Sequence, residues 1–120
     1  MKSILSILLS LILLSSCSSK QEQTYRAPPD VSALHNGGAV PLSITNPRYP
    51  RHAVMNNIEG WVLFEFELDE NGHPINLKLL DSFPGNTFVR GASDAIVKWT
   101  FVKNDTQTKY QYLMQFQLSD

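Results

Sequence analysis

The chain has 120 residues, with 10 Lys and Arg against 11 Asp and Glu and a formal net charge of −1 at pH 7. This length suits one domain, and the basic residues are scattered along it. Because phosphate backbones and anionic lipid headgroups are bound by clustered Lys and Arg, the composition argues against a nucleic-acid partner and against membrane attachment by charge alone.

The first residues have the pattern of a secretory signal. Lys2 supplies a positive charge, an apolar run follows over residues 4–14, and small residues lead up to Cys17. The apolar run is about ten residues long, whereas a helix needs roughly 20 to cross a bilayer. We therefore expect residues 1–16 to direct export and then to be removed.

Cys17 is the one cysteine of the chain, so an exported protein has no internal partner for it, and the alternative is a free thiol left by ordinary signal cleavage. The residues before it, Leu14-Ser15-Ser16, resemble the lipobox of bacterial lipoproteins, in which the cysteine is acylated and begins the mature chain. The resemblance implies a lipid on Cys17. Lipoproteins kept at the inner membrane commonly carry Asp next, and Ser18 therefore implies the outer membrane, with the domain facing the periplasm.

Residues 17–45 are polar and rich in breakers, including Pro28, Pro29 and Pro41. No helical or alternating pattern here is long enough to predict an element. We expect this stretch to be a flexible tether between the lipidated cysteine and a folded domain over residues 46–120.

The first half of the domain predicts a helix and a hairpin. Pro50 suits the first turn of a short helix over residues 50–57. Apolar residues then alternate with polar ones over residues 62–68, as in a half-buried strand. Residues 69–72 end in Asn-Gly, which tolerates the positive φ of a tight turn, and a returning strand follows over residues 75–80.

The second half predicts a helix and a last strand. One helical stripe carries Phe88, Ala92, Ala95, Ile96 and Trp99, and Asn86 precedes it as the expected cap. The run over residues 109–118 alternates between an apolar face and a second face that carries Gln111, Leu113, Gln115 and Gln117. We therefore expect an α+β fold of order α-β-β-α-β, in which two helices cover one face of a three-stranded antiparallel sheet and the last strand is an edge.

These residues also form a known pattern. It consists of Asn46-Pro47, Tyr49-Pro50, Ala53, Ile58-Glu59-Gly60, Val62, Phe64, Phe66, Asn71-Gly72, Phe88, Ala92, Ala95, Trp99 and Phe101. In this order and spacing it resembles the carboxy-terminal domain of the TonB family over roughly residues 47–118. The resemblance implies a domain that binds an extended segment of an outer-membrane receptor, the TonB box, as a strand added to the edge of its sheet.

The expected partner-binding residues follow from this resemblance. An unpaired edge strand is open to another chain, and the last strand offers Gln111, Leu113, Gln115 and Gln117 there. The front of the family pattern adds Asn46, Arg48 and Tyr49, although typical transducers carry Gln where this chain has Asn46.

Two features of the family's energy transducers are missing from this sequence. Transducers begin with an uncleaved membrane helix that bears a histidine, and a long Pro-rich spacer follows. Residues 1–17 hold no histidine, and only three prolines precede residue 46. We expect a protein that binds an envelope partner without transducing energy itself.

No arrangement of residues predicts catalysis, a metal site or a cofactor. His35, His52 and His73 lack ligand spacing, and the acidic residues over 65–70 fit a solvated strand face and turn better than an acid–base pair. The sequence also lacks the nucleophile-elbow and phosphate-loop motifs. We expect a protein that is not an enzyme.

Trp61 lies next to Val62 and is expected on the opposite face of the sheet. Two interpretations stay open: it packs against the tether, or it is an exposed aromatic at an interface. The second supports an alternative function, a passive structural or assembly lipoprotein of the cell envelope that packs against a complex through Trp61 and Leu63.

Overall fold

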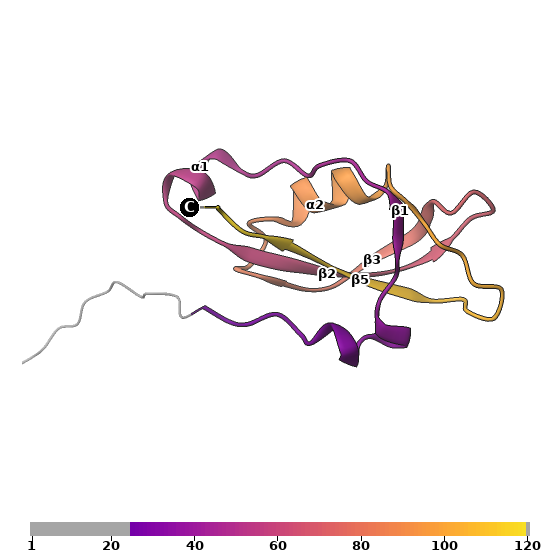
Figure 1. Cartoon of the computed structure of the whole chain (residues 1–120). Coiled ribbons are helices and arrows are strands. Elements are labelled where there is room, and N and C mark those ends of the chain that lie inside the picture. The colour runs from indigo at the N-terminus through magenta and orange to yellow at the C-terminus, as the bar shows by residue number, and fades with distance from the viewer. Residues whose placement is uncertain (1–24, 120) are drawn as a thin grey trace, which may run out of the picture.

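The structure is a computed structural model that describes residues 25–119, so the predicted signal sequence and Cys17 lie outside the described residues. Two 3-10 turns and a short strand precede the predicted elements (Figure 1). In chain order the elements are η1 (Val31–Ala33), η2 (His35–Gly37), β1 (Pro41–Ser43), α1 (Arg51–Met55), β2 (Gly60–Leu68), β3 (Pro74–Phe83), α2 (Val89–Ile96), β4 (Thr100–Phe101) and β5 (Tyr110–Phe116).

The main sheet has the order β3-β2-β5, with both pairings antiparallel. The central strand β2 is buried along most of its length, and the last strand is an edge, as predicted. A second small sheet pairs β1 with β4. The predicted α+β fold, with three antiparallel strands and two helices, is confirmed, and Figure 1 shows both helices on the same side of the sheet.

The core lies between that face of the sheet and α2. Val62, Phe64 and Phe66 alternate along β2 and are at most 1 % exposed, as the period of two requires. They pack with Ala92 and Ile96 of α2 in one apolar cluster. No buried side-chain N or O atom among the described residues lacks a hydrogen-bond partner, so the cluster is free of uncompensated polar groups.

The hairpin between β2 and β3 forms as the sequence predicts. Gly72 has φ of +83°, and the Asp69 carboxylate accepts hydrogen bonds from the main-chain N–H groups of Asn71 and His73, both at 2.9 Å. The returning strand is less regular than its alternation suggested. Its register against β2 shifts twice, Asn76 has φ of +54°, and Ile75 remains 42 % exposed. An irregular edge of this kind is a poor template for another strand.

The prediction that Asn86 caps α2 is wrong. The helix begins at Val89, and its N-cap is Phe88, which has no capping side-chain bond. Asn86 lies before the helix because residues 84–87 form a turn, in which the Thr87 N–H donates to the Pro84 carbonyl at 3.0 Å. Asn86 contributes only its main-chain carbonyl, which accepts from the Val89 N–H at 3.2 Å.

The structure also differs from the expected free tether. Residues 25–39, which we call the strap, cross the sheet on the face away from the helices (Figure 1). Leu34 is buried there with Trp61, Leu63 and Leu113 in a second apolar cluster. The physical reason is that the second face of β2 is itself apolar and must be covered.

Trp61 is therefore a packing residue. It is 1 % exposed, and its indole N–H donates to the Arg26 carbonyl at 2.9 Å. The interpretation that it packs against residues of the expected tether is confirmed, and the exposed-interface interpretation is wrong. The alternative function through Trp61 and Leu63 loses its surface, since the strap occupies it.

No helix among residues 25–119 combines the length and the apolar character that crossing a membrane requires.

Candidate functional site: the outer edge of β5

The main-chain groups of β5 divide between two sides. The Gln111 carbonyl accepts a hydrogen bond at 2.6 Å from Ala39, which lies outside the main sheet. Hydrogen-bonding direction alternates along a strand, so the main-chain groups of Gln111, Leu113 and Gln115 face away from β2. Consistently, the Leu118 N–H turns to the β2 side, where it donates to the Glu59 carboxylate at 2.8 Å.

The strap occupies one end of this outer edge. Ala39 takes the Gln111 carbonyl, and the His35 N–H donates to the side-chain oxygen of Gln111 at 3.1 Å. Within the described residues β5 pairs with β2 alone, so the outward groups of Leu113 and Gln115 are available to another strand. The available edge is thus the half of β5 toward its carboxyl end.

The four predicted edge residues have different surroundings. Gln115 and Gln117 are exposed, and the Gln117 amide donates to the Gln115 side-chain oxygen at 3.2 Å. Leu113 is 8 % exposed because its side chain lies under Leu34 of the strap. Only its main chain can therefore meet a partner.

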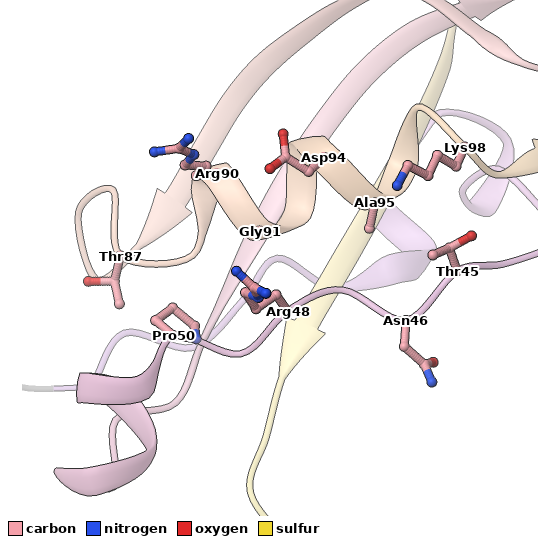
Figure 2. Close-up of a pocket in the computed structure, with 10 residues that line it drawn as sticks. All are labelled: Thr45, Asn46, Arg48, Pro50, Thr87, Arg90, Gly91, Asp94, Ala95 and Lys98. Atoms are coloured by element: carbon pink, nitrogen blue, oxygen red, sulfur yellow. The ribbon is translucent and has the colours of Figure 1, made fainter.

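The residues at the front of the domain lie elsewhere. Tyr49 packs edge-on against Phe116, with ring centroids 5.8 Å apart, and its hydroxyl donates to the Ile58 carbonyl at 2.6 Å. Burial, together with the negative charge of Glu59, raises the pKa of Tyr49. Tyr49 is thus a partly buried residue that packs against the core. Asn46 and Arg48 are exposed and line a cavity beside α2 (Figure 2), so they do not join the Gln residues of β5 in one pocket.

The sequence did not predict the residues that hold the strap. The Arg26 guanidinium donates two parallel hydrogen bonds to the Asp81 carboxylate, at 3.0 and 3.1 Å, and lies over the Trp61 ring at 4.8 Å from its centroid. Tyr25 packs edge-on against Phe83 at 5.4 Å. The available signal was Trp61 itself, because a tryptophan on the outer face of a central strand requires a cover.

The Arg26–Asp81 pair makes docking of the strap sensitive to acid. The hydrogen bonds from Arg26 lower the pKa of Asp81. The stabilisation of the docked strap by this pair is therefore complete above about pH 4, the pKa of Asp81 in the unfolded chain, and is lost as the pH falls through the lower pKa of the folded state.

At pH 7 we expect Asp81→Asn to weaken docking of the strap by less than about 1 kcal/mol, because the pair is solvated. Faster hydrogen exchange at the Trp61 indole would measure it. Asp105→Asn, in an exposed loop, is the control, and equal exchange in both variants would contradict the prediction.

Among residues 25–119, no three His, Cys, Asp or Glu side chains come together in a way that could hold a metal ion. The features that stand out are the half-open strand edge and the cavity beside α2. A half-open edge can bind an extended chain through main-chain hydrogen bonds.

The fold and its edge define a small α+β domain of the kind that can bind an extended segment. The sequence profile described as Gram-negative bacterial TonB protein C-terminal matches residues 45–118. This chain therefore belongs to that family, and the membership expected from the sequence is confirmed.

The relatives agree with this assignment. "Protein TonB" of Yersinia enterocolitica is 38% identical over 64 residues, which are 53% of this chain and 25% of the relative. "Protein TonB" of Vibrio cholerae is 42% identical over 55 residues, 46% of this chain and 22% of the relative. The chain thus matches about a quarter of the length of these curated relatives.

Solved structures show the same fold. The solution NMR structure of the Pseudomonas aeruginosa TonB C-terminal domain aligns with a TM-score of 0.54 at 27% identity, over 69% of this chain and 89% of that one. The Vibrio anguillarum TonB2 protein aligns with a TM-score of 0.54 at 21% identity, over 88% of this chain and 99% of that one, and this second likeness concerns the fold alone.

Proposed function

We propose that this chain is a lipid-anchored binding module in the periplasm, which takes up an extended segment of an envelope protein as an added strand along β5. An outer-membrane receptor of TonB-dependent transport is the leading partner, because the family resemblance implies one. The module works without energy transduction of its own. The single observation that carries the proposal is the free outer edge at Leu113 and Gln115.

The geometry favours β5 over the other edge strand, β3. β5 pairs with β2 in continuous register from Tyr110 to Phe116, whereas the β3 register shifts twice. A regular edge offers evenly placed donors and acceptors, and a bulged edge does not. A partner strand beside β5 would begin next to Ala39 and run along Leu113 and Gln115.

The expected interaction is weak and transient. The free part of the edge supplies the main-chain groups of two outward residues, so the added segment is short. Interfaces of this kind fall at or below about 1,200 Å². Weak binding suits a module that must release its partner.

Site-specific cross-linking tests the proposal. A photoreactive residue at Gln115 is expected to capture the periplasmic amino-terminal segment of an outer-membrane receptor, identified by mass spectrometry of the cross-linked peptide. The matched control is Leu79 on β3, which is 42 % exposed. Capture of the same segment at Leu79 and none at Gln115 would move the site to the other edge and overturn the proposal.

The anchor is tested separately by Cys17→Ser. We expect this variant to fold normally and to leave the membrane, because the apolar clusters of the described domain form without Cys17 and the chain has no second cysteine to carry a lipid. Carbonate washing and density-gradient fractionation measure its distribution, and the unchanged chain is expected in the outer membrane. A Cys17→Ser chain that still sediments with membranes after the wash would contradict the lipid anchor.

A further inference from the structure

A groove of about 640 Å³ runs along the seam where the segment that precedes α1 meets α2. The segment contributes Asn46 and Arg48 to its walls, and α2 with the turn after it contributes Arg90, Asp94 and Lys98. Figure 2 shows where these residues lie: Arg90 and Asp94 on α2, Lys98 just after it, and Arg48 on the segment close to Gly91. This groove lies beside α2, apart from the outer edge of β5.

The segment is fixed against α2 along this groove. The Trp99 indole N–H donates to the Thr45 carbonyl at 2.8 Å, which ties the end of the helical region to the start of the segment. At the middle of α2, a Cβ atom on Gly91 would collide with the Arg48 carbonyl, so the segment lies directly on the helix there. The groove is therefore built into the domain and does not depend on a partner to form.

The groove is positively charged in a chain whose net charge is −1. Three cations line it, against the single carboxylate of Asp94. Among residues 25–119, Arg48, Arg90 and Lys98 have no carboxylate within 4.0 Å, although Asp94 is four positions from both Arg90 and Lys98. Their charges remain available to an anionic ligand.

The distance between the cations indicates how far apart the anionic groups of such a ligand should be. Arg90 lies on α2 and Lys98 lies in the turn after it, eight positions further on, a separation of about 12 Å at the rise of a helix. At that separation each cation can pair with its own anionic group, so a ligand with two such groups engages both. An extended peptide rises about 3.3 Å per residue, so carboxylates four residues apart span nearly the same distance and lie on one face of the peptide.

We propose that this groove is a second binding site, which takes an extended acidic peptide with carboxylate side chains four residues apart. Its two carboxylates pair with Arg90 and Lys98, Arg48 attracts it from the opposite wall, and the amide of Asn46 offers a donor and an acceptor for its main chain. The site is independent of strand addition at β5, because none of its residues belongs to that strand.

A synthetic peptide tests the site directly. The probe is Ser-Glu-Ser-Thr-Ser-Glu-Ser, titrated into the isotope-labelled mature chain with Cys17→Ser. We expect amide shifts at Arg48, Gly91 and Lys98 and an affinity that falls with added salt. Arg90→Gln and Lys98→Gln should each weaken binding about two- to five-fold. Lys78→Gln, a matched exposed cation on β3, should leave it unchanged.

Other outcomes would overturn the inference. If the same peptide with Gln in place of Glu binds equally well, the charge of the peptide does not determine binding. If a peptide with two adjacent glutamates binds equally well, the four-residue spacing does not determine it. If inorganic phosphate causes the same shifts at the same affinity, the groove is a site for small anions. Gln115→Pro should bind the probe normally, and loss of binding in that variant would place the peptide at β5 instead.

Discussion

Gln115→Pro is expected to leave the domain folded and to weaken binding of a receptor segment by about 10-fold or more. Proline removes the main-chain donor of Gln115 and places its ring on the outer edge of β5. That N–H faces away from β2, so the sheet keeps its hydrogen bonds, whereas a partner strand loses one and meets a steric block. Calorimetric titration with the segment captured at Gln115 measures the loss, and a thermal melt reports on folding.

Two neighbouring substitutions serve as controls. Gln115→Thr keeps the N–H and a β-favouring side chain, so it should bind as the unchanged chain does. Met114→Pro removes a donor that faces β2 and disturbs a residue that is 3 % exposed, so it should unfold the domain. If Gln115→Pro is folded and binds its segment normally, strand addition at β5 is wrong.

Trp99→Ala is expected to destabilise the domain by about 3–5 kcal/mol, the range for emptying a large aromatic site in a core. Trp99 is 3 % exposed and packs edge-on against Tyr112, with ring centroids 5.3 Å apart. The substitution also leaves the Thr45 carbonyl without its indole donor. For a domain of this size, the melting temperature should fall by more than about 12 °C.

Val97→Ala is the matched control for this loss. Val97 follows the same helix but is 48 % exposed, so its truncation should move the melt by a few degrees at most. A shift of only one or two degrees in Trp99→Ala would mean that neighbouring side chains or water fill the space of the lost indole with little change in the free energy of unfolding. The packing of α2 on the sheet would then need another explanation.

The regular elements of the domain could be predicted because each carries its own local signal. Alternation in β2 and the Asn-Gly turn fixed the hairpin, and the stripe from Phe88 to Trp99 placed α2 over the sheet. The start of α2 was misplaced because the turn over residues 84–87 depends on contacts that no helical period records. In the same way, alternation in β3 did not disclose the register shifts that leave Ile75 exposed.

The strap could not be predicted because its contacts join residues far apart in the chain. Arg26 meets Asp81 and Trp61, and Ala39 meets Gln111, while the strap itself has no regular period. Such contacts depend on the finished sheet. The candidate edge was accessible from the sequence only in part: alternation indicated which β5 residues share a face, but the Ala39 contact decided which main-chain groups face outward.

If the chain is anchored through a lipid, docking of the strap also limits the distance between the domain and the membrane. It crosses all three strands of the main sheet, from Asp81 on β3 past Trp61 on β2 to Gln111 on β5. If the lipid is on Cys17, the chain from there to Arg26 covers at most about 30 Å, even when fully extended. In that case the docked domain would work within one domain diameter of the bilayer, and a partner's segment would have to approach the membrane that closely to reach β5.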